Sequence, residues 1–499
     1  MDIDESKTTD LAIESLIKPI LSKIPNLVRK LRLRQVSKRW GDLIEEVFEE
    51  ENLWKVLCTN DYIYPWVYNI IEVIFQDTIR NWSSELLSIA WKRIYLFYNY
   101  WSLKIMSTNI HFELMNFEEY APFEGNVQSV DIHADKIAIN IKKTKIIIFE
   151  VKNVSQESSI IPIKLSHLPS NIRLQRRKIT RIKLWFTATK KWILIVHTFK
   201  KPSKSRRMIY IDLNTRKKLY NPFKNQRNIH NFTCASHRLF IATSELVYEC
   251  KYTESNRLVL GNHIFEFRDI FNRTEIEQLN VLEMSAKSTF KEVMVSLLIK
   301  TAAENVRVIN LKISNDNDGI FKRIGCDRDI RIRVTESLFY MPMPGIVFIT
   351  SASEMIINLW YNLTETHKSM EDESERIVQL EAPSVFDVSR ENEFRSSIKS
   401  DADLLRSPLR MLGLDPMKIT SMFFFCNVLF LGTESGAIHM YIADSIKSFI
   451  RKDFFILPTR KLQVSKYPII NINVIGQYGT LLIIATTPKL IHISHLRND

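Results

Sequence analysis

Residue types that carry out catalysis are present in this sequence, but not at the spacings that assemble a common catalytic or metal site. His492 and His495 form the only close pair of histidines. Residues three apart in a strand point to opposite faces, so these imidazoles are not expected to share a metal ion. The sequence contains no GxGxxG, GxxxxGKS/T, GxSxG or HExxH segment. It therefore predicts no catalytic residue, no metal site and no cofactor.

Positive charge is concentrated in residues 173–218. This basic segment holds sixteen Lys and Arg side chains and one acid, Asp212, in a chain of net charge +13. Guanidinium groups bind phosphate and carboxylate oxygens, so a phosphorylated or acidic protein segment is one candidate ligand and RNA or DNA another. Loop charge without a binding role is a third alternative. Trp185 and Trp192 could stack on bases, but their apolar neighbours predict a buried strand. The candidate substrate-binding residues are Arg176, Arg177, Lys178, Lys201, Lys204, Arg206 and Arg207.

The composition is that of a folded globular protein. The chain has 499 residues, 45% of them hydrophobic and 25% charged, which favours two or three domains with sizeable cores. The N-terminal MDIDESKTTD lacks the apolar core of a signal peptide. The densest apolar run, Met422–Leu431, is too short to cross a bilayer, so no membrane association is expected. Five scattered cysteines without a CxxC pair predict reduced thiols and a cytoplasmic or nuclear location.

Helical periodicity extends from the N-terminus to about residue 108. Apolar residues recur three and four positions apart from Ile13 to Ile24, and Pro19 suits only a first helical turn, so a helix is predicted to begin near Leu16. Ser83–Leu103 predicts a further helix. Its aromatic side chains lie close to one stripe, and they are Trp91, Tyr95, Tyr98 and Trp101.

Beyond about residue 109 the pattern changes to the two-residue alternation of β-strands. Paired apolar runs recur without helices between them, and they span Val130–Val151, Ile179–Leu213, Phe232–Tyr252, Val281–Ile313, Arg333–Trp360, Ile419–Ile442 and Ile472–Ile493. Repeated all-β units predict a divergent β-propeller of about seven blades over residues 109–499. A pair of β-sandwiches is the alternative. The polar, acid-rich residues 371–410 predict a long inserted loop.

Three runs near the N-terminus follow one another in a fixed order, and they are Ile20–Pro25 (ILSKIP), Leu33–Trp40 (LRQVSKRW) and Leu53–Leu57 (LWKVL). Together they resemble the F-box, a short three-helix motif with an Ile-Phe-Ser-Tyr-Leu-Pro-like run, a Leu-x-x-Val-Cys/Ser-Lys-Arg-Trp helix and a Leu-Trp-Lys end. Residues 11–58 are therefore identified as an F-box-like motif. Trp91–Tyr95 and Asn99–Trp101, within residues 62–107, look like the aromatic helical linker that precedes the propeller in F-box/WD-repeat proteins.

The resemblance implies that the N-terminal helices bind the Skp-type adaptor of a cullin-RING ubiquitin ligase. A motif of about 45 residues is too small to bury its own apolar surface, so a partner is expected to cover it. The candidate adaptor-binding residues are Leu16, Ile20, Leu21, Ile24, Pro25, Leu31, Leu33 and Val36. Packing of these residues on the aromatic linker is the alternative, and Trp40 and Trp54 are predicted to belong to the core.

The expected fold is thus α plus all-β: an F-box-like three-helix motif, a helical linker and a β-propeller. The leading functional hypothesis is a non-catalytic substrate-recognition subunit of a Skp–cullin–F-box ubiquitin ligase, with the adaptor, the cullin and a protein substrate as partners. The alternative is a propeller scaffold or nucleic-acid-binding protein that acts through the basic segment.

Overall fold

The structure is a computed structural model of the chain. It describes residues 32–59, 66, 67, 70, 71, 84–107, 110, 112–116, 126–141, 145–154, 157–163, 177–200, 205–223, 229–235, 237–253, 255, 257–288, 292–301, 306–314, 321–323, 329, 330, 338–343, 346–350, 355–359, 419–444, 448, 458–477 and 480–496. The predicted loop over residues 371–410 and the predicted helix that begins near Leu16 lie outside these residues.

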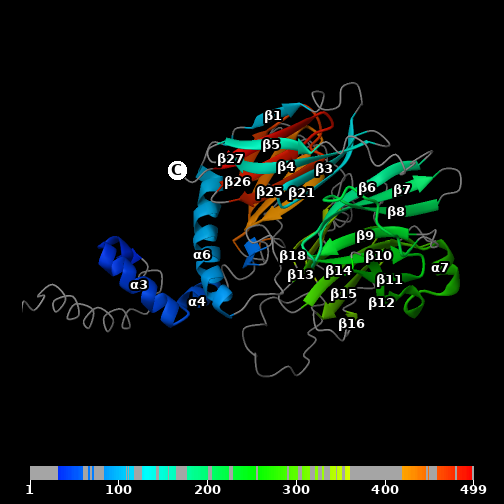
Figure 1. The fold of residues 1–499 in the computed structure, drawn as a ribbon, viewed down its shortest axis with the longest axis horizontal. Coiled ribbons are helices and arrows are strands. Elements are labelled where there is room, and N and C mark those ends of the chain that lie inside the picture. The colour runs from blue at the N-terminus through cyan, green and yellow to red at the C-terminus, as the bar shows by residue number, and fades with distance from the viewer. Residues whose placement is uncertain are drawn as a thin grey trace, which may run out of the picture. The chain divides into compact units, whose positions relative to one another are not determined.

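The chain divides into two compact units (Figure 1). One contains Met1–Val67 and Asn81–Leu103, and the other contains Tyr68–Arg80 and Lys104–Asp499. We call the first the helical unit and the second the propeller unit. The assignment of residues 11–58, 62–107 and 109–499 to separate domains stays a prediction.

The helical unit is built on a short 3-10 turn and three α-helices. They are η1 (Leu33–Gln35), α3 (Lys38–Glu50), α4 (Leu53–Thr59) and α6 (Ser84–Ser107), the last of which confirms the helix predicted over Ser83–Leu103. Helix α3 begins after Ser37, whose hydroxyl accepts a hydrogen bond from the backbone N–H of Trp40 at 3.3 Å. No helix in the described part of the chain is both long and apolar enough to cross a membrane.

Strands of the propeller unit form seven antiparallel sheets within the described residues, each from a consecutive stretch of chain except the last. We number them blades 1 to 7. Blade 1 contains β2 (Val127–His133), β3 (Lys136–Ile141), β4 (Lys145–Val154) and β5 (Glu157–Ile163). Blade 2 contains β6 (Arg177–Phe186), β7 (Trp192–Lys200) and β8 (Ser205–Asp212). Blade 3 contains β9 (Ile229–Ala235), β10 (Arg238–Thr243), β11 (Leu246–Tyr252) and β12 (Leu258–Glu266).

Blades 4 to 7 continue the same order along the chain. Blade 4 contains β13 (Asn280–Ser288), β14 (Glu292–Lys300), β15 (Val306–Ser314), β16 (Phe321–Arg323) and β17 (Asp329–Ile330), and blade 5 contains β18 (Leu338–Met343), β19 (Ile346–Thr350) and β20 (Met355–Leu359). Blade 6 contains β21 (Ile419–Phe425), β22 (Val428–Thr433), β23 (Ala437–Ile442) and β24 (Arg460–Gln463). Blade 7 contains β25 (Asn471–Gln477), β26 (Thr480–Thr486), β27 (Leu490–Leu496) and β1 (Glu113–Asn116). The short helices η5 (Phe267–Asp269) and α7 (Arg273–Gln278) lie between blades 3 and 4.

The first strands of successive blades contact one another around a closed ring. Contacts join β2 to β6, β9 to β13, β13 to β18, β18 to β21, β21 to β25 and β25 back to β2. A hydrogen bond from Arg181 of β6 to Asn231 of β9 supplies the remaining step. A ring of small sheets joined through their first strands is the architecture of a β-propeller. Each of the seven β units predicted from the sequence overlaps one of these blades.

The two ends of the propeller sequence meet in blade 7. Strand β1 pairs with β27 in antiparallel register, with Glu113 opposite Ile493 and Asn116 opposite Leu490. The outer edge of the last blade is therefore completed by the segment that precedes the first blade. This pairing closes the ring through backbone hydrogen bonds and covers an edge strand that would otherwise be unpaired.

The second strands of three blades are buried on both faces along their whole length. Every side chain of β3, β10 and β22 is buried, whereas β24 at the outer edge alternates between half-buried and exposed. A strand in a β-sandwich has one face toward solvent, but a middle strand of a propeller blade has a neighbouring blade on each face. The burial pattern therefore excludes the pair of sandwiches for these sheets.

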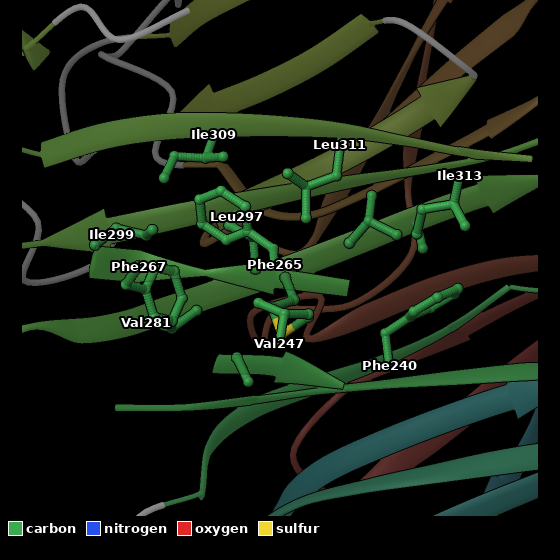
Figure 2. Close-up of a cluster of buried hydrophobic side chains, with 14 of the residues drawn as sticks. Phe240, Val247, Phe265, Phe267, Val281, Leu297, Ile299, Ile309, Leu311 and Ile313 are labelled. Carbon is green, nitrogen blue, oxygen red and sulfur yellow. The ribbon is translucent and has the colours of Figure 1, made fainter. Parts of the chain in front are cut away.

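Hydrophobic clusters fill the spaces between neighbouring blades. Figure 2 shows the cluster between blades 3 and 4, where Phe240 and Val247 face Leu297 and Ile309. Similar clusters join blades 1 and 2, blades 2 and 3, blades 4 and 5, and blades 7 and 1. Because each blade is too thin to enclose a core of its own, stability comes from these contacts between blades.

A threonine ends the second strand or directly follows it in three blades. Thr243, Thr433 and Thr487 each accept a hydrogen bond from a backbone N–H three or four residues on and donate one to the carbonyl of that same residue. The sequence pattern Leu-Phe-Ile-Ala-Thr or Leu-Phe-Leu-Gly-Thr precedes two of these turns. The recurring threonine fixes the hairpin between the second and third strands.

We predict that Gly436→Ala strongly destabilises the propeller. Gly436 has φ of +80°, and an added Cβ would lie 2.1 Å from the Ser465 carbonyl oxygen and 2.6 Å from that of Tyr467. Backbone atoms cannot move aside cheaply, so the free energy of unfolding should fall by about 3 kcal/mol. Urea denaturation measures this change. Gly41→Ala is the matched control: its Cβ would meet only the Arg34 carbonyl oxygen at 3.7 Å. Equal losses in both variants would contradict the prediction.

Candidate docking sites

Helix α3 directs one apolar face toward α4 and α6. Its buried side chains are Leu43, Ile44, Val47 and Phe48. Phe48 packs against Trp54 of α4 with ring centroids 4.9 Å apart, and Trp54 in turn lies 5.7 Å from the Tyr95 ring of α6. Trp54 is buried, as predicted for a core residue, whereas Trp40 is half-buried.

Polar contacts fix the same three helices. The Glu45 carboxylate pairs with Arg34 and, at 2.5 Å, with Lys92 of α6, whose ammonium group also lies 5.8 Å from the Trp54 ring centroid. The Cys58 thiol donates to the Trp91 carbonyl oxygen at 3.2 Å. Burial raises the pKa of Cys58 to about 12, so this thiol is a structural group and not a nucleophile.

Two of the predicted adaptor-binding residues lie in the described part of the chain. Leu33 in η1 is half-buried, and Val36, which directly follows η1 and precedes α3, is 62% exposed. Neither belongs to the apolar face that packs on α4 and α6. The other six lie outside the described residues, and they are Leu16, Ile20, Leu21, Ile24, Pro25 and Leu31.

The basic segment folds mainly into blade 2, and the strand register divides its charge between two ends of that blade. At one end, Arg177 is opposite Lys200, Thr198 is opposite Arg207 and Phe199 is opposite Arg206. We call this the Arg206 end. The turn between β6 and β7 and the turn after β8 lie at the other end, which we call the Lys217 end. The cations therefore do not form one continuous patch.

Most of the predicted substrate-binding residues belong to the Arg206 end. Lys178 and Arg207 are exposed there, and Arg177 lies in β6. Arg176, Lys201 and Lys204 lie outside the described residues.

Arg206 itself joins three blades. Its Nη1 donates to Asn280 Oδ1 of blade 4 at 3.0 Å and to the His230 carbonyl oxygen of blade 3 at 3.5 Å. Desolvation lowers the pKa of this half-buried guanidinium. His230 Nδ1 accepts the Val281 N–H at 3.2 Å, which extends the contact. Arg206 of blade 2 thus links blades 3 and 4 through hydrogen bonds. The sequence pattern did not predict this structural role.

A second polar network runs across the first strands of blades 1 to 4. Lys183 Nζ lies 3.6 Å from Asp131 Oδ1, and Arg181 Nη1 lies 3.0 Å from Glu283 Oε2 and 2.6 Å from Asn231 Oδ1. These charges are paired across blade boundaries. They fix the order and register of neighbouring blades, so two cations of the basic segment serve the fold.

No metal site is found among the histidines that the structure describes. His492 is buried in β27, where desolvation lowers its pKa, and the side chain of its sequence neighbour His495 lies outside the described ones. Among the described residues, no three His, Cys, Asp or Glu side chains are grouped so that they could hold a metal ion.

Comparison with known proteins gives no family assignment. No family model matches the chain, and no curated protein matches it. Three solved structures are similar in part. A chain of the mitotic checkpoint complex is 8% identical, with 76% of this chain and 92% of that chain covered and a TM-score of 0.40. The Dos1 propeller is 8% identical (78% and 96% covered, TM-score 0.37), and the computationally designed Ika8 protein is 10% identical (74% and 96% covered, TM-score 0.35). The propeller architecture therefore rests on the sheet order and the closed ring of strand contacts.

We predict that acidification destabilises the blade 2–blade 3 boundary through His197. Its Nε2 lies 3.3 Å from the Ile229 carbonyl oxygen and its Nδ1 lies 2.8 Å from Thr180 Oγ1, an arrangement that suits the neutral ring. Burial, with Arg206 and Arg181 nearby, lowers the pKa of His197 from 6.5 to about 4. The unfolded chain therefore binds the proton more tightly. The stabilisation is complete above about pH 6.5 and is lost as pH falls through about 4.

The expected loss from His197 is about 2 kcal/mol on going from about pH 7.5 to about pH 5. Urea denaturation across this range measures it. The variant His197→Gln cannot titrate, so its unfolding free energy should depend less steeply on pH. An unchanged slope in that variant would show that His197 does not carry the effect.

Proposed function

We propose that this chain is a non-catalytic substrate-recognition subunit of a Skp–cullin–F-box ubiquitin ligase. In this proposal the N-terminal helices dock on the Skp-type adaptor, which links the chain to the cullin, and the propeller holds a protein substrate. Such a subunit would act in the cytoplasm or nucleus. The observation that carries the proposal is the exposed Val36 side chain, close in sequence to half-buried Leu33, in the segment that resembles the F-box.

The packing of α3 supports adaptor docking at Val36. Leu43, Val47 and Phe48 are already covered within the helical unit, and Trp54 fills the space toward α6. Leu33 in η1 and Val36 directly after it do not belong to this packed apolar face. An aliphatic side chain that is exposed while its neighbours are buried gains stability when a partner removes it from water.

The propeller supports the second half of the proposal. Its ring is closed by β1 and β27, and the blades are joined by hydrophobic clusters and by the network of Arg181 and Asp131. A rigid closed ring presents its turns at fixed positions with little ordering cost on binding. Exposed Lys178 and Arg207 at the Arg206 end provide charge for an acidic or phosphorylated substrate segment.

The test is capture of purified Skp-type adaptor and cullin by the full chain carrying Val36→Asp. A carboxylate at this position should reduce adaptor capture by at least about tenfold, because a charge would be desolvated in the interface. The matched control is Val259→Asp in β12, since Val259 is also exposed, at 46%, but lies in the propeller. The control should capture adaptor as well as the unsubstituted chain.

Two results would contradict the proposal. One is the absence of adaptor from the unsubstituted chain when circular dichroism and cooperative unfolding show it to be folded. The other is equal loss of capture in Val36→Asp and Val259→Asp, which would indicate a nonspecific effect of added negative charge. Retention on oligonucleotides in place of adaptor, with affinity that falls steeply as salt rises, would favour the nucleic-acid-binding alternative.

A further inference from the structure

The Lys217 end of blade 2 displays cations that neither the fold nor the proposed adaptor contact uses. Lys190 lies in the turn between β6 and β7, and Arg216, Lys217 and Lys218 lie in the turn that follows β8. All four side chains are exposed. Within the described part of the chain, none of them forms an ion pair or a side-chain hydrogen bond. The nearest acid in sequence, Asp212, is buried and bound to its own turn.

Backbone hydrogen bonds hold the two turns together. The Leu213 N–H donates to the Trp192 carbonyl oxygen at 2.9 Å, which links the turn after β8 to the start of β7. Asp212 Oδ1 accepts the N–H groups of Asn214 and Thr215 at 2.8 and 3.2 Å. The backbone that carries these cations is therefore fixed before any partner binds, which lowers the entropic cost of association.

An exposed aromatic ring lies beside these cations. The chain returns along β8 after the turn, with Lys218 bridged to Ile211 and the Leu219 N–H bound to the Tyr210 carbonyl oxygen. Leu219 packs on the core between blades 2 and 3, while Tyr220 is 68% exposed. By the alternation of a strand, Lys218 and Tyr220 share one face of this segment, opposite the face on which Leu219 packs on the core between blades 2 and 3.

Carboxylates limit the positive surface on the side of blade 1. The His133 ring of that blade packs against the Trp192 ring, with the two ring centroids 5.4 Å apart. The Lys136 ammonium nitrogen lies 5.3 Å from the Trp192 ring centroid. Lys136 is paired with Asp135 and Glu150 at 3.2 and 3.1 Å. A long nucleic-acid strand that crossed from blade 2 to blade 1 would meet these carboxylates, whereas a short acidic peptide would not have to cross this boundary.

We propose that Lys190, Arg216, Lys217, Lys218 and Tyr220 form a docking surface for a short acidic segment of a partner protein. Carboxylates of the segment would pair with the four cations, and Tyr220 would contact one of its apolar side chains. We call this surface the Lys217 patch. It lies at the opposite end of blade 2 from Lys178 and Arg207, and it does not depend on the helical unit.

Fluorescence anisotropy of the full chain with a fluorescein-labelled peptide rich in glutamate and aspartate tests the proposal. Lys217→Glu/Lys218→Glu should weaken binding by at least about tenfold, because two attractive charges become repulsive. The matched control is Lys461→Glu/Lys466→Glu at exposed positions in and just after β24 of blade 6, which changes the net charge equally and should weaken binding by less than about threefold. Tyr220→Ser should weaken it by about threefold without a change in charge.

An oligothymidine of matched length distinguishes the alternative class of partner. We expect it to bind more weakly than the acidic peptide and to respond equally to the two double variants. Equal loss of peptide binding in both variants would overturn the proposal, because net charge alone would then explain the attraction. Tighter binding of oligothymidine, abolished only by Lys217→Glu/Lys218→Glu, would overturn it in favour of a nucleic-acid surface. Adaptor capture is measured on the same variants and should be unchanged, so this proposal and the ligase proposal can fail separately.

Discussion

The pairing of β1 with β27 is the interaction on which the propeller depends. Each sheet has too few strands to shield both of its own faces, so each relies on the next sheet for cover. Such an arrangement leaves an apolar face at either end unless the series closes on itself. Side chains from blades 1 and 7 meet in one cluster that includes Ile137 and Ile484. The backbone bonds of β1 hold this last boundary in place.

The same blade geometry decides what the basic segment can do. Consecutive antiparallel strands carry neighbouring parts of a sequence to opposite ends of a blade, so a dense run of cations becomes two separate groups. Some of the cationic side chains also contact other blades. Arg181, Lys183 and Arg206 contact polar side chains of other blades, where they specify which blades are neighbours. The net charge of the segment therefore overstates the charge that a partner can meet.

The sequence allowed the position of each blade to be predicted, because alternation and continuous apolar runs are local properties. The helix of the aromatic stripe was predictable for the same reason, and Trp54 was correctly placed in the core. The role of Arg206 in linking blades was not predictable. Its partners Asn280 and His230 come from two other blades, and only the register of the assembled ring brings them within reach. The threonine turns had a visible signal in the Ala-Thr and Gly-Thr ends of apolar runs. The ligase function is a proposal, and it rests on the F-box resemblance of the sequence.

Completion of blade 7 by β1 also has a consequence for synthesis of the protein. On the ribosome, residues 113–116 emerge before blades 1 to 6, but their partner strand, residues 490–496, emerges after them. Six blades must therefore remain in an open arc, with one apolar flank uncovered, until β27 has left the exit tunnel. Contacts so distant in sequence form slowly because the intervening chain must first be ordered. The nascent chain is thus a natural client for chaperones that shield apolar surface, and ring closure should be the last step of its folding.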